Sequence, residues 1–412
     1  MKKLLRKLKL RRRGIALLAG MHFYGNPSAK LKIVGVTGTN GKTTTATLLY
    51  KITMALGHRA GLISTVENII NGKVITTEEG RPVPGTTPDP INLYKLLNKM
   101  VEEKCEYVFM EVSSHALDQS RVAGVNFTGG IFTNLTHDHL DYHKNFDNYF
   151  GAKKKFFKML PAGAFALSNT DDEYGQKMLE GIKAKKYTYG FKKSADFAEK
   201  LETKLIGNFN TYNVLAVYAT LVLLGLDKVK IKEQIKNVLP PKGRFDYFKS
   251  SSGVTVIVDY AHTPDALENV LKTIKQIANV GHRQNLPMSD IGKPKIISVF
   301  GCGGDRDPLK RPIMGKIGAI HSDITILTSD NPRSENPDKI IEQMTTNLSE
   351  DEFRKVKIIP GRHEAIREAV KLAQKGDIIL AAGKGHEDYQ EIKGVKHHFD
   401  DMEEFKKAFT LN

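Results

Sequence analysis

Short apolar runs recur along the chain, and stretches with helical spacing follow many of them. The apolar runs cover residues 107–112, 130–135, 254–258, 296–300, 324–327 and 378–381. Helical patterns include residues 265–278 and 362–374. Strands that alternate with helices favour parallel sheets covered by helices, so the pattern predicts an α/β fold. Ligands in such folds gather at the carboxyl ends of the strands.

The sequence "VTGTNGKTT", residues 36–44, lies between an apolar run and a helix-like stretch at residues 43–56. It departs from the common phosphate-loop pattern, because Val36 stands where that pattern has glycine. Its backbone N–H groups would still cradle phosphate, with Lys42 on the β- and γ-phosphates and Thr43 on magnesium. Transfer of the phosphate to water would make the chain a motor or a switch. Transfer to a carboxylate would make it a ligase.

Domain boundaries follow from this loop and from the proline and glycine of "PPKGRFD", residues 240–246. We predict a basic segment at residues 1–29 and a P-loop ATP-binding domain at residues 30–243. A Rossmann-like α/β domain is predicted at residues 244–412.

The net charge of +16 on 412 residues is concentrated near the N-terminus, where no acidic residue precedes Glu67. Residues 1–13, "MKKLLRKLKLRRR", could attract an anionic membrane surface or an acidic substrate, or form a frayed tail. No run of 18 apolar residues occurs, so a membrane-spanning helix is not expected. The two cysteines are too few for a disulfide framework, which favours a reducing cytoplasm, with residues 1–13 able to add peripheral contact with the inner membrane face.

Candidate metal ligands follow two of the predicted strands. Glu111 ends the apolar run of "EYVFMEVSSH", and "FTNLTHDHLDYH", residues 132–143, brings His139 among two further histidines and two aspartates. Zinc is one interpretation, but the spacing favours an oxygen-rich magnesium site with one imidazole. Tyr149 and Lys153 would share one helical face shortly after.

Nine motifs together resemble the Mur ligases, and among them the tripeptide-synthetase (MurE-type) branch. They are "GVTGTNGKTTT", "TTPDP", "EVSSHALDQSRV", "FTNLTHDHLDYH", "GNFNTYNVLA", "DYAHTPDAL", "GCGGDRDPLKRP", "TSDNPRSENP" and "AAGKGHEDYQ". The resemblance implies an ATP-dependent ligase of peptidoglycan synthesis, in which the terminal carboxylate of a nucleotide-linked peptide becomes an acyl phosphate and an amine then attacks it. Its cofactors would be ATP and Mg²⁺. A CO₂-derived carbamate on Lys153 would turn that cation into an anionic oxygen ligand.

The resemblance also implies roles for individual residues. Metal ligands would be Thr43, Glu111, His139 and the modified Lys153. ATP would contact Gly38, Thr39, Asn40, Gly41, Lys42, Thr43, Thr44, Asn210, Asn213, Arg244 and Asp259, with Arg244 near the γ-phosphate and Asp259 on the ribose. The muramoyl-peptide acceptor would contact Thr86, Thr87, Ser113, Gln119 and Arg121. The incoming amino acid would contact Arg306, Asp330, Asn331, Arg333, Gly383 and Glu387.

The amino acid implied by the resemblance is meso-diaminopimelate. Its distal end is a zwitterion, so Arg333 would pair with the carboxylate and Glu387 with the ammonium. Lysine has no distal carboxylate, and lysine-adding relatives generally lack this arginine.

The family's usual N-terminal domain, which binds the uridine end of the substrate, is not found in the sequence. A partner that supplies this function is therefore one expectation, and a membrane-linked acceptor is another. Three alternatives stay open: a related ligase that adds lysine, one that acts on a pseudomurein- or polyglutamate-type acceptor, and a basic ATPase that binds membranes or nucleic acid. The last rests on the N-terminal charge alone, and no nucleic acid is expected because no aromatic array accompanies the charge.

Overall fold

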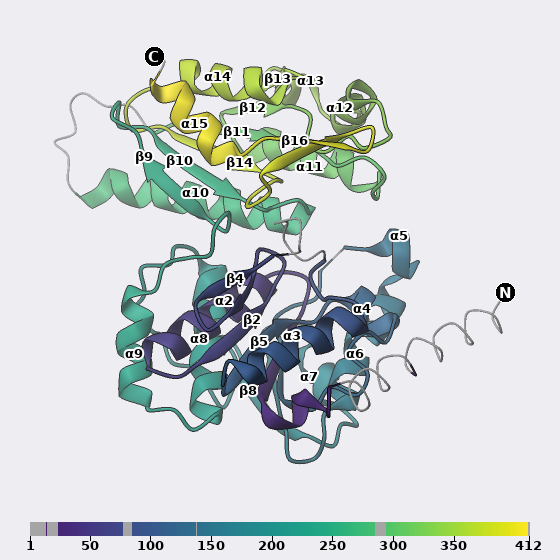
Figure 1. The fold of residues 1–412 in the computed structure, drawn as a ribbon. Coiled ribbons are helices and arrows are strands. Elements are labelled where there is room, and N and C mark those ends of the chain that lie inside the picture. Colours follow the sequence, from purple (N-terminus) through teal and green to yellow (C-terminus); the bar gives the residue numbers. More distant parts are fainter. Residues whose placement is uncertain (1–13, 15–23, 77–84, 137, 285–293, 411–412) are drawn as a thin grey trace. The chain divides into compact units, whose positions relative to one another are not determined.

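The structure is a computed structural model that describes residues 14, 24–76, 85–136, 138–284 and 294–410 (Figure 1). The chain divides into two compact units. Unit 1 runs up to residue 136 and from 143 to 241, and unit 2 takes the segment 137–142 and everything from 242. Residues 1–13, for which the sequence suggests membrane attraction, lie outside the described residues. None of the described helices is long and apolar enough to cross a membrane.

Unit 1 is built on one sheet of eight strands in the order β4-β3-β2-β5-β1-β6-β7-β8. The strands are Lys32–Thr37 (β1), Ala60–Ile63 (β2), Asn68–Ile70 (β3), Lys73–Ile75 (β4), Tyr107–Glu111 (β5), Phe127–Phe132 (β6), Phe165–Asn169 (β7) and Lys185–Tyr189 (β8). The six strands from β2 to β8 in this order are parallel, and β3 and β4 add an antiparallel edge.

The helices of unit 1 cover both faces of this sheet (Figure 1). They are Pro27–Lys30 (η2), Lys42–Ala55 (α2), Pro90–Glu102 (α3), Ser114–Asp118 (α4), Phe146–Met159 (α6), Gly175–Leu179 (α7), Asn208–Leu223 (α8) and Lys228–Asn237 (α9), with Leu140–His143 (α5) at the boundary between the units. Helices α2, α8 and α9 share one core with the side chains of Val34 and Val36. Gly35 faces the opposite side, where a Cβ would lie 2.5 Å from the ring of Phe156 on α6.

The local sequence explains where several of these helices begin. Helix α3 begins after Asp89, whose carboxylate accepts the N–H groups of Ile91 and Asn92, and Pro90 fits the first helical position. Helix α6 begins after Asn145, whose side chain accepts the N–H of Asn148. Both caps satisfy donors that an isolated helix end would leave unpaired.

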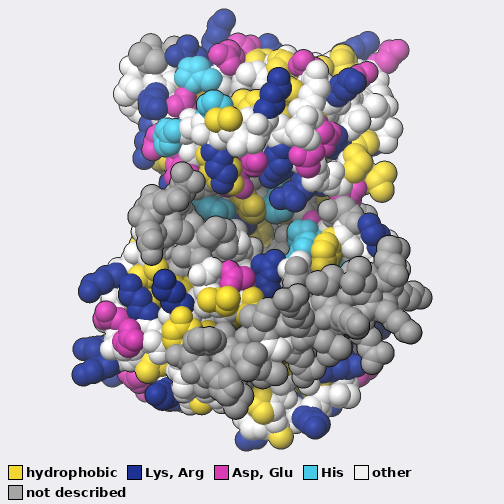
Figure 2. All heavy atoms as spheres, turned by 45° about the vertical axis from the view of Figure 1, so that its right-hand side comes forward, with side chains coloured by type: hydrophobic (Ala, Val, Ile, Leu, Met, Phe, Trp, Pro, Cys, Tyr) yellow, Lys and Arg dark blue, Asp and Glu magenta, His cyan; other side chains and the backbone are white. Residues whose placement is uncertain are grey.

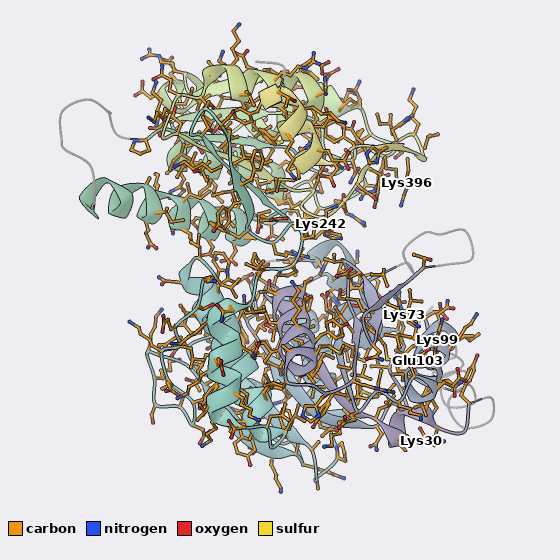
Figure 3. All side chains as sticks on the ribbon, turned by 60° about the vertical axis from the view of Figure 1, so that its left-hand side comes forward. Lys30, Lys73, Lys99, Glu103, Lys242 and Lys396 are labelled. Atoms are coloured by element: carbon orange, nitrogen blue, oxygen red, sulfur yellow. The ribbon has the colours of Figure 1, made fainter. Side chains whose placement is uncertain are left out.

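Unit 2 contains a sheet of six strands in the order β13-β12-β11-β14-β10-β9. The strands are Asp246–Lys249 (β9), Thr255–Asp259 (β10), Ile296–Phe300 (β11), Ile324–Leu327 (β12), Val356–Ile358 (β13) and Ile378–Ala382 (β14). All pairs are parallel except β9 with β10. A separate antiparallel hairpin follows, formed by Tyr389–Ile392 (β15) and Val395–His398 (β16), and Figure 3 shows Lys396 on it.

The helices of unit 2 are Pro264–Gln284 (α10), Lys310–His321 (α11), Pro337–Thr345 (α12), Glu350–Phe353 (α13), Arg362–Leu372 (α14) and Asp401–Thr410 (α15). Helices α14 and α15 share a core with β10, β11 and β14, while α10, α11 and α12 pack side by side (Figure 1). On the face drawn in Figure 2, Lys and Arg side chains of each unit are interspersed with Asp and Glu.

The predicted α/β class is confirmed, with parallel strands and covering helices in both units. The predicted run at residues 130–135 was wrong in its position, since β6 spans Phe127–Phe132. The polar atoms of Thr133 explain the early end: its hydroxyl donates to Asn40 O at 2.7 Å, and its N–H donates to Thr37 O. Helix α10 runs six residues further than the predicted 265–278.

Candidate functional site

The loop at residues 38–41 joins β1 to α2 at the carboxyl edge of the unit 1 sheet. Gly41 caps α2 with φ of 83°, and a Cβ there would lie 2.4 Å from Asn213 Oδ1, so the position requires glycine. Lys42 Nζ donates to the carbonyl oxygens of Gly38 at 2.9 Å and Thr39 at 2.7 Å. A loop at a helix N-terminus with a lysine folded over it suits bound phosphate.

Most of the predicted ATP ligands of unit 1 lie at this loop. Thr43 and Thr44 are buried in the first turn of α2. The Asn40 N–H donates to Asn134 Oδ1 at 2.8 Å. From α8, Asn213 accepts the Thr45 hydroxyl at 3.4 Å and donates to Asn210 Oδ1 at 3.2 Å. The structure therefore brings the two asparagines to the start of α2.

Lys153 reaches the same loop from α6. Its side chain is 1% exposed, and Nζ donates to Gly38 O at 2.6 Å. The ammonium also lies 4.6 Å from the centre of the Tyr149 ring, and the Tyr149 hydroxyl lies 3.0 Å from Thr39 Oγ1. Tyr149 and Lys153, four residues apart, thus both touch the phosphate loop.

Glu111 ends β5 and is 1% exposed. One carboxylate oxygen accepts the Thr65 N–H at 2.7 Å, and the other accepts the Thr65 hydroxyl at 3.2 Å. Thr65 Oγ1 also lies 3.0 Å from Thr86 Oγ1 and can accept its hydroxyl proton, which joins the metal candidate to the predicted acceptor residues.

The predicted acceptor residues form one hydrogen-bonded group. Thr87 donates to Glu111 O at 2.8 Å, and the Ser113 N–H donates back to Thr87 Oγ1 at 3.1 Å. Arg121 donates to Thr87 O at 2.9 Å, and its guanidinium is held by two further bonds to Gln119 Oε1. Residues from two separate stretches, 86–87 and 113–121, therefore come together at the end of β5.

Of the histidines in residues 137–143, the structure describes His139 and His143, which belong to different units. His139 lies in the segment assigned to unit 2, with φ of 55°, and its Nε2 is 3.3 Å from Asp138 Oδ2. His143 lies in unit 1, where its Nε2 is 3.0 Å from Ser114 Oγ. Burial, followed by the charge of His115, lowers the pKa of His143 to about 4, so its imidazole is neutral at physiological pH. His137 lies outside the described residues, whose side chains include no group of three or more His, Cys, Asp or Glu able to hold a metal ion.

Arg244 and Asp259, the other predicted ATP ligands, belong to unit 2. The Arg244 guanidinium lies 4.4 Å from the centre of the Tyr260 ring. Asp259 ends β10, and its carboxylate accepts the Phe245 N–H at 2.6 Å. Burial raises the pKa of Asp259 to about 6, although Arg244 and the backbone N–H groups oppose the shift.

The predicted amino-acid residues meet at the carboxyl ends of β12 and β14. Asn331 Nδ2 donates to Glu387 Oε2 at 2.7 Å. Gly383 has φ of 107°, and a Cβ there would lie 3.3 Å from Asp330 Oδ2. Burial and the charge of Asp330 raise the pKa of Glu387, while Lys384 opposes the shift. Arg306 is exposed on the loop after β11.

Arg333 is held by the hairpin β15–β16. Its backbone has φ of 49°, its N–H donates to Glu391 O at 3.1 Å, and its carbonyl accepts the Lys393 N–H at 2.8 Å. The guanidinium donates to Gly304 O at 2.7 Å, and its Nε lies 3.5 Å from Glu391 Oε2. The charge of this half-buried side chain adds to that of Lys384 in opposing the rise in the pKa of Glu387.

Sequence reasoning missed Thr65, which holds Glu111, and Lys384, which is buried among the amino-acid residues. Thr65 follows the short strand β2, and a polar residue just after a strand could have been recognised as a candidate site residue. Lys384 stands inside the quoted "AAGKGHEDYQ", but a lysine between two glycines gave no indication of burial.

Two family models match the chain: the Mur ligase middle domain over residues 36–221, and the Mur ligase glutamate ligase domain over residues 243–385. Curated relatives named UDP-N-acetylmuramoyl-L-alanyl-D-glutamate--2,6-diaminopimelate ligase match nearly the whole chain. That of Parabacteroides distasonis is 50% identical over 405 residues, which cover 94% of this chain and 80% of the relative. That of Cytophaga hutchinsonii is 52% identical and covers 92% and 78%.

Solved structures show the same fold. A structure with the same ligase name superimposes with a TM-score of 0.61 at 30% identity, covering 96% of this chain and 83% of that one. A Mycobacterium tuberculosis folylpolyglutamate synthase complexed with ADP superimposes with a TM-score of 0.70 at 16% identity, covering 93% and 95%. The second likeness concerns the fold alone.

Proposed function

Because the chain belongs to the Mur ligase family, we propose that it is an ATP-dependent ligase that adds meso-diaminopimelate to a UDP-N-acetylmuramoyl-dipeptide in peptidoglycan synthesis. The relatives with this printed name are about half identical to it over almost its full length. The choice of amino acid rests on a guanidinium and a carboxylate of unit 2: Arg333 follows β12, Glu387 follows β14, and the charge of Arg333 opposes the rise in the pKa of Glu387.

The first chemical step is phosphorylation of the dipeptide's terminal carboxylate. A carboxylate oxygen attacks the γ-phosphorus of ATP, the bond to ADP breaks, and an acyl phosphate forms. Lys42 and the N-terminus of α2 bind the phosphates, and the acceptor group around Thr87 and Arg121 holds the peptide. Catalysis of this step is mainly positioning and charge neutralisation.

The second step forms the amide bond. The amine of diaminopimelate attacks the acyl carbon, a tetrahedral intermediate forms, and inorganic phosphate leaves as the amine gives up a proton. Unit 2 selects the incoming amino acid by the distal end of its side chain. Arg333 pairs with the distal carboxylate there, and Glu387 pairs with the distal ammonium. Lysine would leave Arg333 without a partner, which costs a few kcal/mol for a charged group in a closed site.

Magnesium fits the oxygen donors of unit 1. The Thr43 hydroxyl and the Glu111 carboxylate are ligands that Mg²⁺ prefers, and bound metal would neutralise charge on the transferring phosphate. A bare Lys153 ammonium would repel the metal. Addition of CO₂ to the neutral amine, with loss of one proton, gives a carbamate whose oxygens could bind it together with His139.

The test is purified enzyme with ATP, Mg²⁺ and UDP-muramoyl-dipeptide, assayed for phosphate release against a panel of amino acids. Diaminopimelate should be preferred over lysine on the order of a hundredfold. Arg333→Ala should narrow this gap and leave the KM for ATP unchanged, whereas Arg354→Ala, the matched control at an exposed arginine, should keep the preference. Preference for lysine would assign the chain to the lysine-adding ligases. Phosphate release that depends on DNA or lipid instead of peptide would refute the ligase.

A further inference from the structure

Lys384 follows β14 and has no exposed side-chain area. Its Nζ donates to Asn331 Oδ1 at 3.2 Å. Two carboxylate oxygens lie slightly further away, Asp330 Oδ1 at 3.6 Å and Glu387 Oε2 at 3.8 Å. Burial of an ammonium is costly unless acids surround it, so these oxygens are what makes the position tolerable.

The charges around Lys384 do not balance. Arg362 is paired with Asp401 by two bonds of 2.7 Å, and Arg333 lies beside Glu391. Setting those two pairs aside leaves two carboxylates, Asp330 and Glu387, and one ammonium, Lys384. The group therefore carries one net negative charge. One further cation, such as the distal ammonium of an amino acid, would neutralise it.

Lys384 also sets the orientation of Glu387. Asn331 Oδ1 accepts both the Lys384 ammonium and the Glu391 N–H, the latter at 2.9 Å. With its oxygen held in this way, the amide must turn its nitrogen toward Glu387 Oε2. The other carboxylate oxygen, Oε1, lies 3.5 Å from the Tyr260 hydroxyl. Removing the ammonium would leave the amide oriented by the Glu391 N–H alone and would weaken its hold on the carboxylate.

We propose that Lys384 is a positioning residue that holds Glu387 oriented and negatively charged, so that the site accepts an amino acid whose far end is cationic. The proposal rests on the function proposed above and adds the group on which its selectivity depends. Lys384 itself does not touch the amino acid. It acts through Glu387 and Asn331.

The kinetic test compares Lys384→Met, which keeps the side-chain length, with the wild-type enzyme. Without the ammonium, two buried carboxylates face each other, so the pKa of Glu387 rises further and more of it is protonated. The KM for diaminopimelate should rise about tenfold or more at pH 7, with the KM for ATP within about twofold. The ratio of the variant's KM to the wild-type KM should shrink from pH 7 to pH 9 as Glu387 ionises.

A charge-balanced variant separates electrostatics from packing. Lys384→Met combined with Asp330→Asn restores the net charge of the group, so its KM should lie closer to wild type than that of Lys384→Met alone. If the double variant is no better than the single one, and the KM ratio is constant with pH, Lys384 acts only by filling space and the proposal is overturned.

A stability measurement keeps the proposal testable without turnover. In Lys384→Met the folded state holds a proton on Glu387 that the unfolded chain releases, so stability relative to wild type should fall as pH rises above the usual range of carboxyl pKa values. The groups that face Glu387 and could contribute are Asp330, Arg333, Arg362, Tyr260 and Tyr389.

Adding Glu387→Gln to Lys384→Met should remove this pH dependence, whereas an equal difference in unfolding midpoint at every pH would overturn the proposal. If Lys384→Met does not fold, recovery of folding in the Glu387→Gln double variant supports the proposal, and failure of both variants overturns it. If the stability difference depends on pH but the enzyme does not use diaminopimelate, the proposed function is refuted and the role of Lys384 stands.

Discussion

The buried ion pair between Arg362 and Asp401 should be the most stability-determining polar contact of unit 2 that a single substitution can break. Both side chains are 0% exposed, and two bonds of 2.7 Å join them in a two-pronged geometry. Arg362 also donates to Ala382 O at 3.2 Å, which ties the starts of α14 and α15 to the end of β14. Arg362→Met would leave Asp401 charged and buried without its partner.

The expected cost of Arg362→Met is about 3–5 kcal/mol, the range found when one member of a buried pair is removed. For a domain of this size, each kcal/mol lowers the melting temperature by about 2–4 °C, so the unit 2 transition should fall by roughly 6–20 °C. Calorimetry of the full chain would measure it. Arg354→Met is the matched control, because Arg354 and its partner Asp351 are 76% and 89% exposed and the midpoint should not change.

The double variant Arg362→Met/Asp401→Leu removes both charges and should recover much of the lost stability. A shift below about 1 kcal/mol for Arg362→Met would show that the pair is no stronger than a surface pair, and the reasoning would be refuted. The same conclusion would follow if the double variant were less stable than the single one.

Three further predictions concern other parts of the chain. Lys153→Ala should reduce turnover by about a hundredfold or more, with partial rescue by a short carboxylic acid in place of the carbamate, and full activity of this variant would exclude Lys153 from the metal site. Asp259, whose pKa burial raises to about 6, should make the protein less stable as pH rises from about 4 to 7, by up to roughly 3 kcal/mol. Asp259→Asn should flatten that slope in denaturant titrations, and an unchanged slope would contradict the raised pKa. Deletion of residues 1–20 should leave turnover on soluble substrate unchanged and weaken binding to anionic vesicles at low salt, and a loss of turnover would contradict a role in location alone.

The strands and most helices could be predicted because each depends on a local pattern. The runs at residues 296–300 and 324–327 coincide with β11 and β12, since apolar side chains there face covering helices. The run at residues 130–135 misled because Leu135 continues the apolar pattern while Thr133 already bonds to the phosphate loop. Such a contact depends on the neighbouring strand, which a local pattern does not contain.

The site could be predicted only as far as motifs mark it. Gly41 and Lys42 are recognisable from spacing, because a phosphate loop is continuous in sequence. The support of Glu111 by Thr65 follows from β2 lying next to β5, a strand order that the sequence does not show. The charge balance around Lys384 likewise depends on strand order, because Asp330 follows β12, Lys384 follows β14, and β11 lies between these two strands.

The hairpin β15–β16 places an evolutionary constraint on the chain. Arg333 is held by main-chain bonds to Glu391 and Lys393, which any residues could make. Apart from Glu391, whose side chain also lies 3.5 Å from the Arg333 guanidinium, these main-chain bonds tolerate substitution in the hairpin but not a change in its length. One inserted residue would shift the register of the pairing and move the main-chain groups that hold Arg333. Insertions and deletions in this hairpin, more than substitutions, would change which amino acid a descendant of this enzyme adds.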